Sequence, residues 1–459
     1  MKNIIFKFSI SLMVMCFFCN CDSFVEIDLP PGQLNTPSVF EDRTTANAAM
    51  ADLYTKLRDS GLITGNGTGL SNLMGNYTDE LIYYGSATTG IPPFYNNTLT
   101  ANNGTVASLW NDSYNQIYSA NAIIQGVAAS ASLRQTDKDQ LTGEALFVRA
   151  LIHFYLVNLY GAVPYITTTD YEINRHAGRL ATELVYQSII TDLVQAQNLI
   201  QEDYVAAERI RPNKGAVNAL LARVYLYHGD WAEAANTASV VLSDGQYGLE
   251  SNVNMVFLKG STSTIWQFKP MAEGVNTAEG GNFVFTSGPP PFVALREDLV
   301  NAFEPGDYRR ISWIGTVSDG STTWYFANKY KEQTNTGSSV EFSIVLRLSE
   351  QFLIRAEARV RQDELSGAKD DLNVVRHAAG LGNTPAVSQQ EIIDAILRER
   401  RVELFTEYGH RFFDLKRSNA LDATLSTVKT GWNTTDALLP LPETELLLNP
   451  NLAPQNTGY

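Results

Sequence analysis

The chain has 459 residues, 44% hydrophobic and 18% charged, a composition typical of a folded protein with a large core. Its formal net charge is −15. A negative charge of this size repels nucleic-acid phosphates and anionic lipid heads. It therefore argues against nucleic acid as a partner and favours a neutral or cationic ligand.

The first residues of the chain predict an export signal. Lys2 and Lys7 precede an apolar run at 8–18 that is broken only by two serines. This run is shorter than the roughly 20 apolar residues of a membrane span. Residues 1–20 are therefore predicted to be a signal peptide. Its removal takes away two lysines and brings the net charge to −17.

All three cysteines lie in this N-terminal stretch, and Cys21 is the last of them. The stretch resembles a bacterial lipoprotein signal, which is cleaved just before a cysteine that carries lipid. Cys21 leads directly into polar sequence and is the preferred anchor. Cys19 is the alternative anchor, and a plain cleaved signal without lipid is the alternative to both. Residues 21–40 contain three prolines and are predicted to form an extended tether.

Apolar residues at three- and four-residue spacing predict a mainly α chain after residue 40. The predicted helices cover 46–57, 106–128, 136–160, 182–200, 214–228, 231–242, a pair within 344–378, and 389–408. Asp139 is predicted to complete a cap with Thr136 at the start of the third helix. Gly229 and Asp230 separate two alanine-rich helices, and this unit resembles a tetratricopeptide helix pair.

Two long irregular segments interrupt the helices, at 61–105 and at 249–343. The second contains β-prone runs at 264–268 and 322–326. Because helix pairs precede and follow it, residues 41–459 are predicted to form a single domain in which 249–343 is an insertion. Long loops inside a compact domain are uncommon unless they are functional, so both segments are candidates for the binding site.

Catalytic and metal-binding patterns are missing from the sequence. The five histidines are scattered, and neither HExxH nor GxSxG occurs. No enzymatic activity, cofactor or metal is therefore predicted. Asp79 and Glu80 could be a glycosidase pair, but adjacent carboxylates rarely reach the required separation of about 5–9.5 Å across a cleft. A solvated acidic turn is the preferred interpretation. The charged run at 398–403 is predicted to form structural ion pairs that hold the C-terminal tail.

Five segments, in order, resemble the SusD/RagB family of nutrient-binding outer-membrane lipoproteins of Bacteroidetes. They are GEALFVRALIHFYLVNLYGAVPY (143–165), RPNKGAVNALLARVYLYHGDWAEA (211–234), LRLSEQFLIRAEA (346–358), RERRVELFTEYGHRFFDLKR (398–417) and LLPLPETELLLNPNLAPQNTGY (438–459). The resemblance covers nearly the whole chain. It implies a mainly α, SusD-like fold: a right-handed helical scaffold of tetratricopeptide-like helix pairs with irregular loop and β insertions.

The resemblance also implies a function. A protein of this family is lipid-anchored in the outer membrane, faces the cell surface, and captures an oligosaccharide for a SusC-like TonB-dependent transporter. Asp22, Glu26 and Asp28 resemble the acidic mark that directs such lipoproteins to the outer face. Three alternatives remain open: a peptide or glycopeptide cargo, an adaptor that binds only proteins, and an exported glycan hydrolase.

A neutral sugar is bound by flat apolar faces together with amides and carboxylates. Aromatic side chains in a polar, glycine-rich loop have no helix face to pack on, so Tyr83, Tyr84 and Tyr95 are the first candidates for ligand contact. The other candidates in the two long segments are Asp79, Phe94, Asn96, Phe283, Phe292, Trp313 and Trp324. Trp110, Trp231 and Trp266 lie in periodic elements and are predicted to be core residues.

Overall fold

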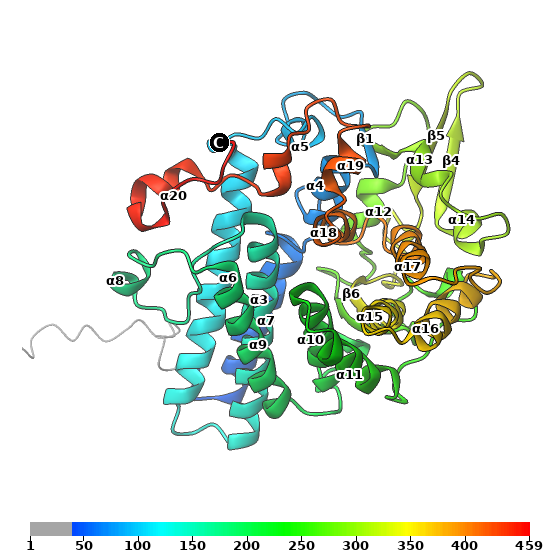
Figure 1. The fold of residues 1–459 in the computed structure, drawn as a ribbon. Helices are drawn as coiled ribbons and strands as arrows, with labels where there is room; N and C mark the ends of the chain where they lie inside the picture. The colour runs from blue at the N-terminus through cyan, green and yellow to red at the C-terminus, as the bar shows by residue number, and fades with distance from the viewer. Residues whose placement is uncertain (1–38) are drawn as a thin grey trace, which may run out of the picture.

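The computed structural model describes residues 39–459, which form a mainly helical body (Figure 1). The predicted signal peptide at 1–20, Cys21 and nearly all of the predicted tether at 21–40 lie outside the described residues. Among residues 39–459, no helix combines the length and the apolar character needed to span a membrane.

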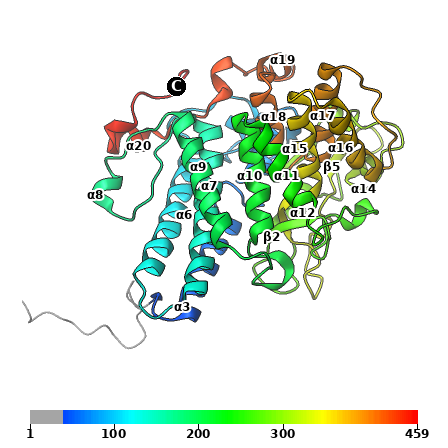
Figure 2. The ribbon, with the colours of Figure 1, turned by 60° about the horizontal axis from the view of Figure 1, so that its bottom comes forward.

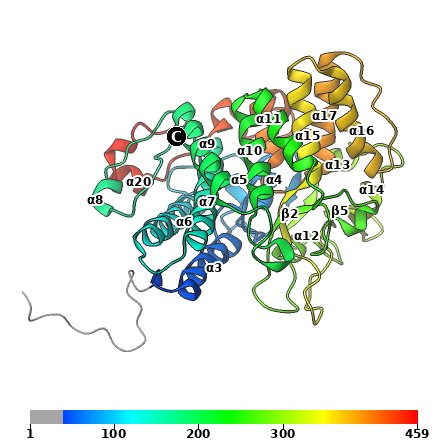
Figure 3. The ribbon, with the colours of Figure 1, turned by 90° about the horizontal axis from the view of Figure 1, so that it is seen from below.

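The main helices form a row, and all but the last of them are at least 12 residues long. They are α3 (Arg43–Asp59), α6 (Gly104–Ala129), α7 (Gln135–Tyr160), α9 (Thr182–Leu199), α10 (Lys214–His228), α11 (Trp231–Leu242), α15 (Leu348–Arg361), α16 (Leu365–Ala378), α17 (Gln389–Glu403) and α18 (His410–Arg417). Figures 2 and 3 show α10 and α11 between the group α6, α7 and α9 and the group α15, α16 and α17. The mainly α prediction is confirmed.

The predicted pair α10–α11 is confirmed at both of its helices. Gly229 ends α10 with φ 96°, a conformation that glycine adopts without strain, and its N–H donates to the carbonyl of Tyr225 at 2.9 Å. Buried alanines let the two helices approach closely. Ala222 of α10 and Ala234 of α11 share one apolar cluster with Ala358 of α15. The small residues therefore join the pair to the next helix of the row.

The predicted cap at Thr136 and Asp139 is wrong. Helix α7 begins one residue earlier, so both residues lie inside its first turns, and Arg134 at the N-cap makes no side-chain capping bond. Asp139 instead accepts a hydrogen bond from Gln135 Nε2 at 2.7 Å. This contact joins two residues four apart on one helix face.

Two predicted helices begin or end differently in the structure. The start of the predicted pair at 344–378 is strand β6 (Ser343–Arg347), in which every residue is buried. The predicted helix at 389–408 ends at Glu403, because Thr406 and Tyr408 have positive φ values of 53° and 43°. This turn directs the side chain of Glu407 into the protein interior, where it is 8% exposed.

Residues 39–459 contain two small antiparallel sheets, the first of which connects the long irregular segments. The first has the strand order β1 (Leu81–Tyr83), β3 (Val293–Leu295), β5 (Thr323–Ala327), β4 (Ile314–Ser318). The second pairs β2 (Thr264–Phe268) with β6. The β-prone runs at 264–268 and 322–326 are thus confirmed as strands. Because β1 belongs to segment 61–105 and its partner β3 to segment 249–343, the two long segments form one sheet.

The other α-helices of residues 39–459 are short. They are α4 (Leu70–Tyr77), α5 (Pro92–Tyr95), α8 (Tyr171–Asn174), α12 (Ala278–Phe283), α13 (Glu297–Val300), α14 (Tyr308–Ser312), α19 (Leu421–Leu425) and α20 (Glu443–Leu448). An apolar cluster joins Leu81 of β1 and Leu295 of β3 to Val402 and Phe405 at the end of α17. The single-domain assignment of residues 41–459 remains a prediction.

Buried charges at the end of α17 bind the insertion. Glu403, which is 5% exposed, accepts a hydrogen bond from Arg309 Nη1 at 2.7 Å and pairs with Arg347. Glu407 lies 2.8 Å from Arg347 and 2.5 Å from Lys329. Arg309 and Lys329 belong to the insertion, and Arg347 is the last residue of β6. The ion pairs therefore attach the insertion to the helical body.

Neighbouring residues of α17 bind two other parts of the chain. Arg400 donates to Asp414 of α18 at 2.8 Å, and Arg401 donates to Asp79 of segment 61–105 at 2.9 Å. The ion pairs predicted for 398–403 are confirmed. Asp414 lies beyond the last predicted helix, in the predicted C-terminal tail, whereas the other partners lie in the insertion and in segment 61–105.

Glu279 of α12 is buried against segment 61–105 with little compensation for its charge. A Cβ at Gly65 would lie 2.1 Å from Glu279 Oε2, so only glycine allows this close approach. The hydroxyl of Ser343 donates to Glu279 Oε2 at 2.8 Å. Burial raises the pKa of Glu279 from 4.5 to about 7, and the nearby carboxylates add to the effect. The folded chain therefore holds the proton more tightly than the unfolded chain.

We expect Glu403→Gln to lower the free energy of unfolding by about 3–5 kcal/mol, because it leaves two buried arginines without a shared counter-charge. Urea denaturation followed by circular dichroism measures this change. The control is Glu364→Gln, a carboxylate 60% exposed and 3.8 Å from Arg359, for which a loss below about 1 kcal/mol is expected. Equal losses for the two variants would contradict the structural role of the α17 ion pairs.

Glu279→Gln is expected to stabilise the protein at pH 8 but not at pH 4.5. A raised pKa in the folded state means that the contribution of Glu279 to stability is complete below about pH 4.5 and is lost as the pH rises through 7. Glutamine imitates the neutral acid, so the gain at pH 8 should be about 1–3 kcal/mol. Urea denaturation of both proteins at the two pH values measures it. Exposed Glu297→Gln should show no such dependence, and a pH-independent Glu279→Gln effect would refute the assignment.

Candidate functional site

The edge strand β1 places the candidate aromatic residues beside the insertion. Tyr83 pairs with Val293 in the β1–β3 register. Beyond the strand end, the backbone N–H of Tyr84 donates to the carbonyl of Phe292 at 2.7 Å. Continuing the register by one step sets Tyr84 opposite Phe292. Residues directly opposite one another in an antiparallel pair point to the same face, with Cβ atoms about 4.5–5.5 Å apart.

Tyr84 and Phe292 form an exposed aromatic pair. Tyr84 is 39% exposed and Phe292 is 52% exposed. Tyrosine and phenylalanine favour strands. The hydrogen bond between the two backbones fixes the positions of the two Cα atoms relative to each other. Two large aromatic side chains that are exposed on hydrogen-bonded backbones are available to a ligand. The structure thus brings together two residues that are more than 200 positions apart in the sequence.

Tyr83 points to the opposite face of β1 and lies against Tyr95 of α5. Their ring centroids are 6.4 Å apart with an interplanar angle of 40°. The Tyr83 hydroxyl donates to the carbonyl of Ser86 at 2.8 Å and lies 2.6 Å from the hydroxyl of Thr89. Both rings are half-buried. We call the four side chains of Tyr83, Tyr84, Tyr95 and Phe292 the aromatic edge.

Lys429 holds Tyr95 in place and was not predicted from the sequence. Its Nζ lies 4.2 Å from the centre of the Tyr95 ring and donates to the carbonyls of Tyr95 at 3.0 Å and Asn76 at 2.5 Å. Burial, together with Arg296, lowers the pKa of Lys429 to about 7. Lys429 lies in the C-terminal tail with no motif around it, so only the folded chain reveals this contact. Asn96, next to Tyr95, is exposed and offers an amide beside the aromatic edge.

Four predicted ligand contacts are buried instead, and this interpretation is corrected for each of them. Phe94 packs against Tyr77, with ring centroids 6.1 Å apart, and is fully buried. Trp313, 2% exposed, donates from Nε1 to a backbone carbonyl inside the insertion. Phe283 and Trp324 pack in two apolar clusters beneath and beside the first sheet. Phe94 is buried in the core of the helical body. The other three face the protein because the insertion has apolar clusters of its own, which the sequence pattern did not show.

Trp110 and Trp266 are buried core residues, as predicted, and Trp231 packs partly buried against the α10–α11 cluster. Tyrosines, rather than tryptophans, therefore supply most of the aromatic edge.

The predicted solvated turn at Asp79 and Glu80 is wrong, because both side chains are buried. Asp79 accepts hydrogen bonds from Arg411 at 2.8 and 2.7 Å in addition to the bond from Arg401. Burial alone would raise the pKa of Asp79, but the two guanidinium groups hold it below its usual value. Burial and the neighbouring Asp79 raise the pKa of Glu80 to about 7. Asp79 therefore serves as an anchor for α17 and α18 and does not face a ligand.

The aromatic edge provides flat apolar faces at the surface, with an exposed amide at Asn96. Such faces suit the C–H side of a sugar ring, and amides suit its hydroxyl groups. Within residues 39–459, no cluster of three or more histidine, cysteine, aspartate or glutamate residues is arranged to hold a metal ion.

Two family models match the chain. The model described as "Starch-binding associating with outer membrane" matches residues 40–226, and the model described as "SusD family" matches residues 301–459. Together they match most of the chain and leave out residues 227–300, which contain α11 and the first half of the insertion.

Individual proteins give the same result. SusD-like protein P25 of Formosa agariphila is 24% identical over 98% of this chain and 98% of its own length. A SusD-like protein of Bacteroides fragilis has the same fold with a TM-score of 0.79 and 22% identity, covering 92% of this chain and 98% of that protein. A laminarin-binding SusD-like protein has a TM-score of 0.78 and 24% identity, covering 92% and 100%. On this combined evidence from sequence and fold, the chain belongs to the SusD/RagB family.

Proposed function

We propose that this protein is a non-catalytic glycan-binding protein that captures an oligosaccharide at the aromatic edge. The observation that carries the proposal is the exposed pair of Tyr84 and Phe292 at the end of the first sheet. The similarity to a laminarin-binding SusD-like protein supports the ligand class. A carbohydrate ligand also fits the charge of the chain, since a neutral polymer is not repelled by a strongly acidic protein.

A rigid support makes the pair suitable for binding. Hydrogen bonds between β1 and β3 fix both backbones, so little conformational entropy is lost when a ligand covers the rings. Aromatic side chains with few rotatable bonds add large contact areas at low entropic cost. Asp79 is buried and paired with two arginines, so its carboxylate is not placed to act on a surface ligand. This arrangement supports binding without hydrolysis.

The proposed role includes a partner and a location. The captured oligosaccharide passes to a SusC-like TonB-dependent transporter in the outer membrane, and lipid on Cys21 holds the protein at the cell surface. Membership of the SusD/RagB family supports both parts, as does the family description that mentions association with the outer membrane. If no glycan binds, the alternative is the same role with a peptide or glycopeptide cargo.

We expect the double variant Tyr84→Ala/Phe292→Ala to bind its oligosaccharide about tenfold more weakly or worse. Each lost aromatic contact removes about 0.5–1.5 kcal/mol beyond the buried area, and a factor of ten corresponds to about 1.4 kcal/mol. The measurement is isothermal titration of the purified full chain with a panel of neutral oligosaccharides that includes laminarin fragments.

Val387→Ala is the control for this experiment, because Val387 is an apolar side chain 71% exposed in the loop before α17. Its affinity should equal that of the unmodified chain. If the unmodified chain binds a glycan and the double variant binds it equally well, the aromatic edge is not the site. Appearance of shortened glycan in the titration cell would instead favour a hydrolase.

The predicted lipid anchor is tested separately from the ligand. Cys21→Ala should abolish N-terminal acylation and release the protein from the membrane fraction, whereas Cys19→Ala should leave both unchanged. Mass spectrometry of the N-terminal peptide, together with fractionation of cells that express the full chain, measures these properties. An acylated Cys21→Ala protein, or an unacylated N-terminus in the unmodified chain, would refute Cys21 as the anchor.

A further inference from the structure

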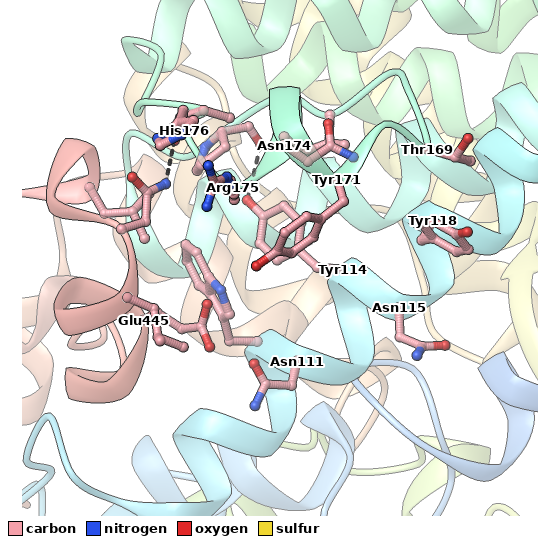
Figure 4. A pocket seen from close by; sticks show the side chains of 17 residues that line it. Asn111, Tyr114, Asn115, Tyr118, Thr169, Tyr171, Asn174, Arg175, His176 and Glu445 are labelled. Atoms are coloured by element: carbon pink, nitrogen blue, oxygen red, sulfur yellow. Dashed lines mark hydrogen bonds between the residues drawn. The ribbon is translucent and has the colours of Figure 1, made fainter. Parts of the chain in front are cut away.

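A cavity lies on a different part of the body from the aromatic edge. Its volume is about 650 Å³, and it is enclosed by α6, by residues 164–177 including α8, and by α20 with residues 449–452 (Figure 4). Figure 1 shows α8 and α20 at the left of the body, whereas β4 and β5 lie at the right. Ligand pockets typically have volumes of about 300–1,000 Å³, so the cavity is large enough for a small ligand.

Helix α6 supplies an aromatic wall. Trp110, Tyr114 and Tyr118 follow one another at four-residue spacing, so they share one face of the helix. Trp110 is buried and lies 4.8 Å from Tyr114 between ring centroids, whereas Tyr118 at the mouth is 52% exposed. Asn111 and Asn115 line the cavity one position further along the same helix. This wall therefore combines ring faces with amides.

Hydrogen bonds between distant segments hold the cavity open. The Tyr114 hydroxyl donates to the carbonyl of Pro164 at 3.0 Å, which fixes the 164–177 segment to α6. Asn449 donates to the carbonyl of Ala177 at 2.8 Å, and Asn451 donates to the carbonyl of His176 at 2.9 Å. The C-terminal tail is thus fastened to the same segment. The cavity is already formed, and a ligand does not have to order its walls.

Glu445 of α20 is the polar group that points to a ligand. Figure 4 shows its carboxylate directed from α20 toward the space beside α6. It is half-buried and lines the cavity, and within residues 39–459 no ion pair or hydrogen bond involves its carboxylate. Partial burial raises its pKa. A carboxylate that loses water without gaining a partner carries a cost, which a ligand with hydroxyl groups would relieve.

The charges around the cavity select the class of ligand. Arg175, which also lines it, lies 2.8 Å from Glu172 and is therefore already paired. The carboxylate of Glu445 repels an anionic ligand. Ring faces on α6, several amides and an acceptor carboxylate together match a molecule with apolar C–H faces and many hydroxyl groups.

We propose that this cavity is a second saccharide site, which binds one or two sugar residues of an uncharged glycan. Tyr118 and Tyr171 at the mouth, 52% and 70% exposed, cover the ring faces, and Glu445 accepts hydrogen bonds from hydroxyl groups. The inference rests on the proposed function for the class of cargo, but it assigns different residues and a different face of the molecule.

The experiment uses the full chain carrying Tyr84→Ala/Phe292→Ala, so that binding at the aromatic edge is removed. Saturation-transfer NMR and isothermal titration are performed with neutral probes: glucose, galactose, mannose, xylose, N-acetylglucosamine, maltose, cellobiose and laminaribiose. At least one probe should bind.

Adding Glu445→Gln or Tyr118→Ala should weaken this binding at least tenfold. Glu443→Gln, an exposed carboxylate in the same helix, is the matched control and should change nothing. Both test residues lie at the solvent side, and thermal melting verifies that the variants fold.

The outcomes separate the two sites. Binding that persists in the double variant and is lost with Glu445→Gln and Tyr118→Ala supports the second site, whatever happens at the aromatic edge. Loss of all glycan binding in the double variant leaves the proposed function intact and overturns the second site. Binding that is insensitive to both cavity substitutions also overturns the second site. Glucosamine is added as a cationic probe. If it binds and no neutral sugar does, the proposed ligand class for this site is refuted.

Discussion

The buried ion pairs of α17 are the constraint on which the rest of the structure depends. Arg309 and Lys329 of the insertion, and Asp79 of segment 61–105, are charged groups that cannot be buried without partners. Glu403, Glu407 and Arg401 supply those partners from one short stretch of chain. Both irregular segments are therefore fixed to the same element of the helical body.

This fixation explains how irregular segments can carry a precise surface. Once both segments are attached to α17, β1 meets β3, and the first sheet spans the two of them. The sheet then sets Tyr84 opposite Phe292, and Lys429 lies over the ring of Tyr95, which packs against Tyr83. The helical row provides the rigid frame, and the two irregular segments together carry the proposed contact surface. Functional residues are often carried in this way on loops that a rigid scaffold positions.

The sequence predicted the helical body well because its signals are local. The alanine spacing and Gly229 predicted α10 and α11 to the residue, since close helix approach and a left-handed turn need those residue types. The site was predictable only in part. Tyr84 and Phe292 stand out as aromatics in polar loops, but their pairing depends on a strand contact between distant segments. Trp313 looked equally exposed, and its burial depends on an insertion core that no periodicity reveals. Asp79 was misinterpreted because its partners are more than 300 residues away.

The most direct test of this account is a crystal structure of the full chain with a bound oligosaccharide from the neutral panel. The account predicts sugar rings stacked on Tyr84 and Phe292, with hydroxyl groups near Asn96. An occupied glycan that touches neither aromatic side chain would contradict it.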